Sequence, residues 1–128
     1  MAFVNVEVRR SGRAMPPLQE GQVSVGKSGL ARFRTADLRL VGIEGEVALL
    51  CDISTQRIGL RKPRFPEDIG SVVCVGEVKS EGKPVPDKRM ISLGPAIRQL
   101  GLLPAAVRGR AELMTKDGLL IISLADRD

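Results

Sequence analysis

LARFRTADLRLVGIEGEVALLCDISTQRIGLRK, residues 30–62, is the stretch that decides the fold of this chain. It predicts a short strand, a short helix that ends at Gly42, and two further strands joined by turns. Residues 90–124, MISLGPAIRQLGLLPAAVRGRAELMTKDGLLIISL, predict the same order of elements, with Gly101 ending the second helix. One such β-α-β-β unit cannot bury its apolar face alone, whereas two units can bury theirs against each other. The repeat therefore predicts a mainly β fold with two short helices, a small closed β-barrel built from two tandem β-α-β-β units.

The length of 128 residues fits a single compact domain that spans residues 1–128. We place the internal repeat units at residues 1–62 and 70–128, joined by a linker at residues 61–70, which holds two prolines and a cluster of charges. Duplication explains the order and spacing of the two units, and chance convergence is the alternative.

Several local expectations accompany this division. Alternating apolar residues predict strands at residues 3–8 and 22–25, and residues 72–75 begin a strand of the second unit. The stretch SEGKPVPDKR, residues 80–89, predicts a loop, as do residues 9–21. Thr35 is expected to cap the first helix, and the apolar run Val47–Ile53 predicts a strand buried on both faces.

The composition points to an aliphatic core and to the cytoplasm. Hydrophobic residues make up 43% of the chain and aromatic residues only 2%. No stretch approaches the roughly 18 apolar residues of a membrane span, and the alternating N-terminus does not resemble a secretory signal. Cys51 and Cys74 lie in apolar runs, which indicates buried, reduced thiols, with a disulfide as the alternative.

The residues available for chemistry argue against an enzyme. The chain has no histidine, which removes the commonest general base and the commonest metal ligand. Two distant cysteines cannot form a zinc site by themselves. Asp52 and Asp117 are the remaining catalytic candidates, and both stand at turn positions that already explain them. We therefore expect no catalytic activity, no metal and no cofactor.

One stretch imitates a nucleotide-binding motif. GQVSVGKS, residues 21–28, matches the phosphate-loop pattern G-x-x-x-x-G-K-[ST]. That motif requires a buried strand before it and a long helix after it. The preceding residues read as a loop, QVSV alternates like a strand, and no long helix follows Ser28. We therefore predict a basic strand and turn rather than a phosphate site.

The excess positive charge lies in the first half of the chain. Residues 1–64 carry eleven Lys and Arg against six Asp and Glu, whereas residues 65–128 carry nine of each. Lys27, Arg32, Arg34 and Arg39 surround one turn, one strand and one short helix. Arginine suits phosphates and guanine edges, and the scarcity of aromatics argues against binding of single strands by base stacking. Duplex DNA is the predicted partner, and an ordinary solvated basic surface is the alternative.

The stretch SGLARFRTADLRLVGIEGEVALLCDISTQRIGLRKP, residues 28–63, resembles the AbrB/MazE-like swapped-hairpin domain, as does the second unit. The resemblance implies that two units, usually from two chains, interleave into a small β-barrel. It also implies a DNA-binding regulator or an antitoxin, with Lys27, Arg32 and Arg34 on the first hairpin, and Arg39 on the helix, touching DNA. The chain departs from the family at Arg34, where a proline is usual, and in the few basic residues of its second unit. Two units in one chain also resemble the double-psi barrels.

Two functions remain open from the sequence. The first is a DNA-binding protein of the swapped-hairpin regulator type, which contacts duplex phosphates through its basic first unit. The alternative is a protein-binding or structural assembly module, antitoxin-like or a subunit, with no nucleic-acid role. A homodimer or another protein is then the partner. The sequence also leaves two possibilities open for the barrel: one chain closes it alone, or two chains exchange hairpins to form it.

Overall fold

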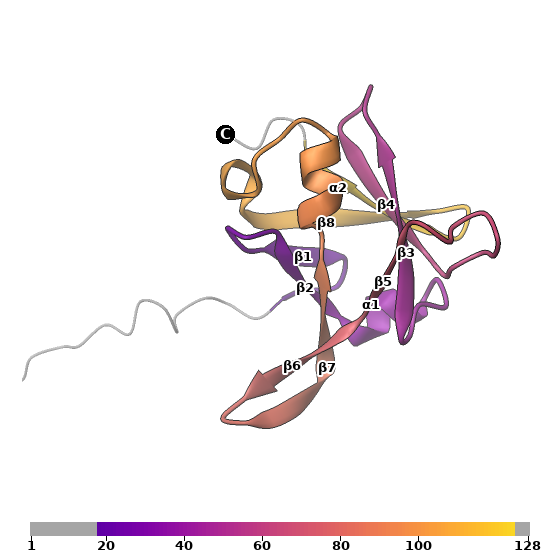
Figure 1. Cartoon of the computed structure of the whole chain (residues 1–128). Coiled ribbons are helices and arrows are strands. Elements are labelled where there is room, and N and C mark those ends of the chain that lie inside the picture. The colour runs from indigo at the N-terminus through magenta and orange to yellow at the C-terminus, as the bar shows by residue number, and fades with distance from the viewer. Residues whose placement is uncertain (1–17, 125–128) are drawn as a thin grey trace, which may run out of the picture.

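The computed structural model describes residues 18–124 of the chain (Figure 1). The elements of the first half are β1 (Gln22–Val25), β2 (Leu30–Arg34), α1 (Thr35–Arg39), β3 (Glu46–Asp52) and β4 (Arg57–Arg61). Those of the second half are β5 (Val72–Cys74), β6 (Gly76–Ser80), β7 (Lys83–Ser92), α2 (Gly94–Gln99), the 3₁₀ helix η2 (Pro104–Val107), β8 (Gly109–Lys116) and β9 (Leu119–Ser123). The strand expected at residues 3–8 and most of the loop expected at residues 9–21 lie outside the described residues.

The strands of the described residues form one antiparallel sheet in the order β5-β3-β4-β9-β8-β1-β2-β7-β6. β5 and β6, at the two ends of this order, are separated in the chain by Val75 alone. The sheet therefore curls until its first and last strands meet, and the Val75 N–H donates to the carbonyl of Gly45, just before β3, at 3.0 Å. The predicted fold class is confirmed: mainly β, with two short helices, nearly closed into a barrel. A single chain supplies all the strands of this sheet.

The strand pairings run between the two halves as much as within them. Within the halves, β1 pairs with β2, β3 with β4, β6 with β7 and β8 with β9. Between the halves, β2 pairs with β7, β4 with β9, β1 with β8 and β3 with β5. If the two halves are exchanged, with β5 and β6 together taking the place of β1, each pairing in this set becomes another pairing of the same set. The arrangement is compatible with two interleaved units, and their origin by duplication stays a prediction.

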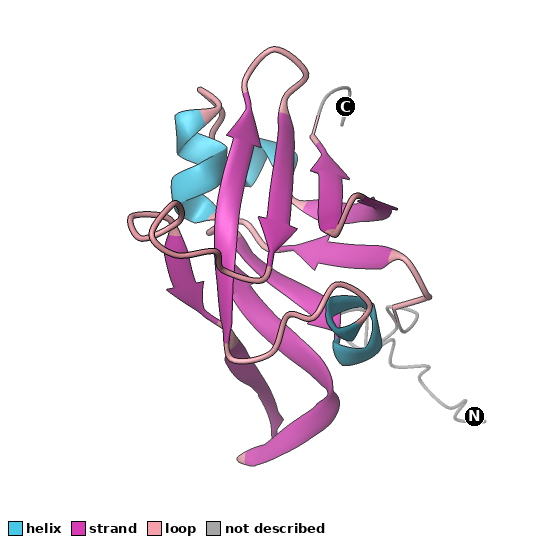
Figure 2. Ribbon diagram, turned by 90° about the vertical axis from the view of Figure 1, so that its right-hand side faces the viewer, coloured by secondary structure: helices cyan, strands magenta, loops and turns pink. Residues whose placement is uncertain are grey.

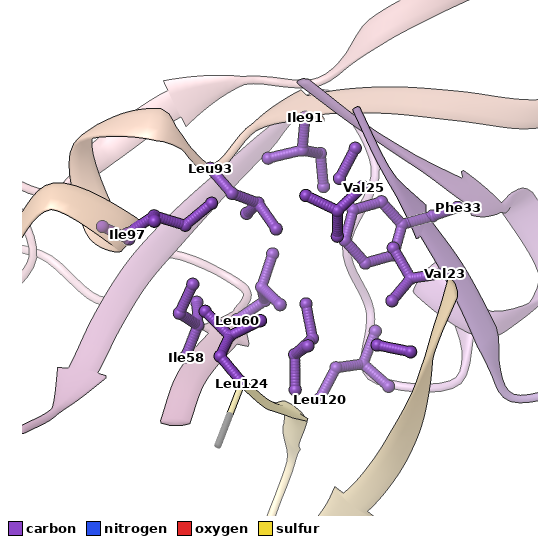
Figure 3. Close-up of a cluster of buried hydrophobic side chains, with 14 of the residues drawn as sticks. Val23, Val25, Phe33, Ile58, Leu60, Ile91, Leu93, Ile97, Leu120 and Leu124 are labelled. Atoms are coloured by element: carbon purple, nitrogen blue, oxygen red, sulfur yellow. The ribbon is translucent and has the colours of Figure 1, made fainter. Parts of the chain in front are cut away.

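Aliphatic side chains fill the inside of the barrel (Figure 3). Along β2, Ala31 and Phe33 point inward and are fully buried, and along β4 the same holds for Ile58 and Leu60. The side chains that meet there come from both halves: Val23, Val25, Phe33, Ile58, Leu60, Ile91, Leu93, Ile97, Leu120 and Leu124. Burial of each large aliphatic side chain stabilises the fold by about 1.5–3 kcal/mol. The two halves therefore share one core.

The first helix begins differently from the prediction. Arg34 is its N-cap residue, no side chain caps the helix, and the expectation for Thr35 was wrong. The Thr35 hydroxyl instead donates to the carbonyl of Pro86 on β7, at 2.9 Å, an acceptor that only the fold brings near. The predicted end at Gly42 is confirmed, because Gly42 has a φ of 76° and the Ile43 N–H donates back to the Leu38 carbonyl.

The loop predicted at residues 80–89 is wrong. These residues form the end of β6 and most of β7, a hairpin that projects from the barrel (Figures 1 and 2). Proline lacks a backbone donor and is tolerated where the edge of a strand has no partner. Pro84 and Pro86 meet this condition, because β2 pairs with β7 only from Lys88 onward.

A buried carboxylate holds the segment between β4 and β5. Asp68 is only 3% exposed and accepts hydrogen bonds from Arg61 Nε at 3.0 Å and Nη2 at 2.7 Å. It also accepts one from the backbone N–H of Arg64 at 2.9 Å. The hydrogen bonds from Arg61 lower the pKa of Asp68, and those to Asp68 raise the pKa of Arg61. The segment predicted as a linker is therefore fastened to β4.

The cysteines are less buried than predicted. Cys51 is half-buried, its thiol donates to the Ala96 carbonyl at 3.4 Å, and burial raises its pKa. Cys74 is exposed, so the expectation that both thiols are buried was wrong for it. Cys74 pairs with Glu46, five residues before Cys51 on β3, so the cysteines are about 16 Å apart, too far for a disulfide. The apolar run of β3 is buried on both faces only at its start, at Val47 and Ala48.

Candidate nucleic-acid interface

The outward side of four neighbouring strands, β8-β1-β2-β7, carries cations from both halves of the chain. On β2, alternation buries Ala31 and Phe33 and places Arg32 and Arg34 outside, as the sequence predicts. The neighbouring strands add one lysine and one arginine. We call the resulting set the basic face: Arg32, Arg34, Lys88 and Arg110.

The register of the strands brings these four residues together. Arg32 lies opposite Ser24 on β1, and Ser24 lies opposite Arg110 on β8. Arg34 lies opposite Lys88 on β7. Adjacent strands are about 4.8 Å apart, so the backbones at Arg32 and Arg110 are separated by about 10 Å. The small side chain of Ser24 leaves the space between these two arginines open.

Arg34 is the member of the basic face that lies next to a buried carboxylate. Arg34 Nη1 lies 3.8 Å from the Oδ1 atom of Asp37, which is buried and accepts a hydrogen bond from the Gly21 N–H at 3.1 Å. Between residues 18 and 124 no carboxylate lies within ion-pair distance of Arg32 or Lys88. No acid of the described residues therefore neutralises the charge on these two side chains, which suits an anionic partner.

The border of the basic face is polar. Arg110 Nη1 donates to Gln22 Oε1 at 3.5 Å, and Gln22 lies opposite Glu112 on β8. Glu112 is exposed and introduces a negative charge at this border. The positive surface therefore ends at Glu112 and extends toward β7.

Lys27 lies at one end of the basic face. It belongs to the turn between β1 and β2, which is closed by the Gly26 N–H donating to the Leu30 carbonyl at 3.0 Å and by the Gly29 N–H donating to the Gly26 carbonyl at 2.9 Å. The turn packs on the start of α2, where the Leu93 N–H donates to the Gly29 carbonyl at 2.8 Å. Lys27 is exposed there and lies beyond the row of Arg32.

Arg39 lies at the opposite end of β2, so the structure does not bring it together with Lys27. The five residues of β2 alone span about 16 Å. Arg39 lines a hollow of about 380 Å³ together with Arg89, Glu44 and Glu77. Two arginines and two glutamates give this hollow a mixed charge, unlike the basic face.

Lys88 and Arg110 are members of the basic face that the sequence did not predict. Both belong to the second half, whose charges balance, so composition gave no reason to select them. Their neighbourhood with Arg32 and Arg34 depends on the pairings of β2 with β7 and of β1 with β8. A register between strands more than fifty residues apart carries no local signal in the sequence.

The phosphate-loop motif is a strand and a turn, as predicted. Within residues 21–28, β1 occupies Gln22–Val25, and the strand β2 begins at Leu30, two residues after Ser28. The helix whose N-terminus would bind phosphate is therefore missing after this motif.

The described residues were also compared with the requirements of a metal site and of a catalytic carboxylate. In the described part of the chain, no three His, Cys, Asp or Glu side chains gather where they could hold a metal ion. Asp52, considered as a catalytic candidate, accepts hydrogen bonds from the Ser54 hydroxyl at 2.7 Å and the Thr55 N–H at 3.4 Å. These bonds lower the pKa of Asp52 and make it part of the β3–β4 turn.

Comparison with known proteins adds no relative: no family model matches the chain, and neither a curated protein nor a solved structure matches it. The resemblance to the AbrB/MazE-like domain therefore stays a prediction from the sequence. Among the described helices, none has the length and apolar character needed to cross a membrane.

Proposed function

We propose that the protein binds duplex DNA through the basic face, with Lys27 extending the contact at one end. The observation that carries this proposal is the convergence of Arg32, Arg34, Lys88 and Arg110 on one outward surface of the sheet. Lysine and arginine side chains bind phosphates through charge and release counterions from DNA. Such contacts supply affinity and orientation, whereas base contacts would supply specificity.

The distribution of aromatic residues supports duplex rather than single-stranded DNA. Single strands are held by bases stacked on exposed aromatic side chains. In the described residues the aromatics are Phe33, which is buried in the core, and Phe65, which follows β4. Since β4 is not a strand of the basic face, neither side chain offers a stacking platform there.

We also propose that the two halves are divergent tandem units of the AbrB/MazE-like type. The exchangeable set of strand pairings supports this, as does the equivalent position of the helices after β2 and β7. In this proposal the first unit supplies Arg32 and Arg34, and the second adds Lys88 and Arg110. A cytoplasmic location accords with this role.

Titration of a mixed-sequence duplex, followed by fluorescence anisotropy at several salt concentrations, tests the proposal. The wild-type affinity should fall as salt rises, with a slope of about 0.9 per phosphate contacted. Arg32→Ala and Lys88→Ala should each weaken binding about five- to tenfold and reduce the salt slope by about one contact. Lys83→Ala, at the exposed start of β7 on the projecting hairpin, is the matched control and should leave both values unchanged.

Two results would remove the DNA proposal. One is the absence of duplex binding by the wild-type protein at low salt. The other is binding that is insensitive to salt and equally strong in Arg32→Ala, Lys88→Ala and Lys83→Ala. Circular dichroism of each variant establishes that its fold is intact.

The alternative, a protein-binding module, is favoured by a different observation. On β9 the outward positions Leu119 and Ile121 are apolar, next to a half-exposed Met114 on β8. Such a surface fits a protein rather than a nucleic acid. This surface adjoins the basic face on β8, where Arg110, Met114 and Ile121 line one hollow of about 310 Å³.

A further inference from the structure

Two runs of the sequence contain cations but no acid. Residues 21–36 hold Lys27, Arg32 and Arg34, and residues 88–111 hold five Lys and Arg, with no Asp or Glu in either run. The acids of residues 18–124 precede these runs, lie between them or follow them. Such a run has no carboxylate of its own to neutralise its cations, so its charge is available to an anionic partner.

The fold places the two acid-free runs against each other. β2 pairs with β7, from Leu30 opposite Ser92 to Arg34 opposite Lys88. β1 pairs with β8, and between β7 and β8 the second run forms α2 and η2. Cations that are more than fifty residues apart in the sequence therefore gather in one part of the molecule.

Three cations of these runs lie outside the basic face and are exposed: Lys27, Arg98 and Arg108. We call these three residues the basic end. Arg89, the other cation outside the basic face, donates to three carbonyls of its own strand and is engaged there. Within residues 18–124 no carboxylate lies within ion-pair distance of any member of the basic end. These three charges are therefore as suited to an anion as those of the basic face.

Arg98 lies beside the β1–β2 turn because this turn packs on the first residue of α2. Gly29 and Gly94 approach each other closely there, and a Cβ atom on Gly94 would lie 3.2 Å from Arg98 Nη1 and 3.4 Å from the Ser28 carbonyl oxygen. Arg98 is four residues after Gly94, about one helical turn, so its side chain extends back over this glycine. The guanidinium and the residue that follows Lys27 therefore flank the same glycine.

Arg108 reaches the same turn through β8. It directly precedes Gly109, which lies opposite Val25 at the end of β1. The backbone of Arg108 is therefore next to Gly26, the residue before Lys27. The three members of the basic end come from three different segments of the chain and gather around one turn.

The basic end and the basic face lie in line along β2. The five residues of this strand, from Leu30 beside the turn to Arg34, span about 16 Å. Each strand of a DNA duplex carries a phosphate about every 3.4 Å along the helix axis. The turn and Arg34 are therefore about five base-pair steps apart, and one duplex that follows β2 can contact both sets of cations.

We propose that the duplex bound by the basic face continues over the β1–β2 turn, where Lys27, Arg98 and Arg108 bind its phosphates. This extension of the site depends on the proposed DNA binding. It adds Arg98 and Arg108 to the contacts and makes the bound DNA run along β2 rather than across the four strands. Arginine binds phosphate through charge-assisted hydrogen bonds, and such contacts position a duplex without reading its sequence.

Titration of a mixed-sequence duplex with the full chain, followed by fluorescence anisotropy at several salt concentrations, tests the basic end. Arg98→Ala and Arg108→Ala should each weaken binding about fivefold and lower the salt slope by about 0.9, the value of one phosphate contact. Arg98→Lys keeps the charge and should bind within about twofold of the wild type, since lysine binds phosphate as a point charge. Arg57→Ala, an exposed arginine on β4, is the matched control and should leave both values unchanged.

Duplex binding by Arg98→Ala and Arg108→Ala that equals the wild type, while Arg32→Ala binds weakly, would overturn the basic end and leave the basic face in place. An equal loss in Arg57→Ala would also overturn it, because the effect would then follow net charge rather than position. A wild-type protein that does not bind the duplex removes both proposals. Thermal unfolding of each variant establishes that weakened binding is not a loss of fold.

Discussion

Gly29 lies where the backbones of the two halves meet, and its carbonyl accepts a hydrogen bond from the Leu93 N–H at 2.8 Å. Its φ is 91°, and a Cβ atom on it would lie 2.7 Å from the Cα atom of Gly94, at the start of α2. Such a distance is far below van der Waals contact, and the Gly94 Cα and N atoms that the Cβ would meet belong to backbone that cannot move aside easily. The turn that carries Lys27 therefore depends on two glycines that are 65 residues apart.

Gly29→Ala should destabilise the protein strongly. It combines the strain of a left-handed conformation, about 1–2 kcal/mol, with a backbone clash that separates the turn from α2, so we expect a total of more than about 3 kcal/mol. Gly82→Ala is the matched control, because Gly82 also has a positive φ, 78°, but nothing lies within 4 Å of its Cβ position. It should cost only about 1 kcal/mol. Urea denaturation of both variants measures the difference, and equal losses would show that the contact with Gly94 contributes nothing.

At the scale of elements, the segment between β4 and β5 was predicted as a linker, but hydrogen bonds hold it against β4. Its prolines and charges mark a boundary in the sequence, yet Asp68 binds Arg61 through two hydrogen bonds and the Arg64 backbone through a third. The lowered pKa of Asp68 means that folding favours its ionised form. Because the folded pKa is depressed, this contribution is present above the ordinary pKa of about 3.9 and is lost as the pH falls through the folded value.

Asp68→Asn should therefore lower the stability at neutral pH and flatten its dependence on acid. The free energy of unfolding should fall below that of the wild type, since the partly buried guanidinium of Arg61 loses the closer of its two carboxylate partners, Asp68 at 2.7 Å, and keeps only Glu67 at 3.9 Å. The difference should stay constant above about pH 5 and shrink as the pH falls below the ordinary aspartate pKa of about 3.9. Chemical denaturation between pH 3 and pH 7 measures this. Asp87→Asn, at an exposed position of β7, is the control and should follow the wild type; a constant difference at all pH values would contradict the linkage.

At the scale of the whole molecule, the barrel is a joint product of both halves. Each half forms two hairpins by itself, whereas the pairings of β1 with β8, β2 with β7, β3 with β5 and β4 with β9 cross between the halves. The core is shared in the same way, with Phe33 and Ile58 from one half packed in a cluster with Ile91 and Leu120 from the other. Neither half has a complete sheet or core of its own.

Residues 1–69 and 70–128, produced separately, should therefore not fold. A hairpin without further strands or a packed face is marginal in water. Each fragment should show no cooperative thermal transition by circular dichroism, whereas the full chain should unfold in a single transition. A cooperative transition in either fragment alone would show that one unit is stable by itself.

Much of the local structure could be predicted from the sequence. The helix ends at Gly42 and Gly101, the hairpin at Asp117-Gly118 and the outward direction of Arg32 and Arg34 all follow from short-range rules. The hairpin at residues 80–89 could not be predicted, because its prolines are acceptable only on an edge that β2 leaves unpaired. The candidate site was half predicted for the same reason: two of its cations lie on strands whose neighbours are set by long-range pairing.

The sequence by itself determined the order of most strands and helices, the aliphatic core and the outward side of β2, because alternation, glycine and turn residues act over a few positions. Only the tertiary structure decided which strands are neighbours. That choice adds Lys88 and Arg110 to Arg32 and Arg34 and separates Lys27 from Arg39. The physical reason is that the register between distant strands is set by burial of a shared core, which no single segment encodes.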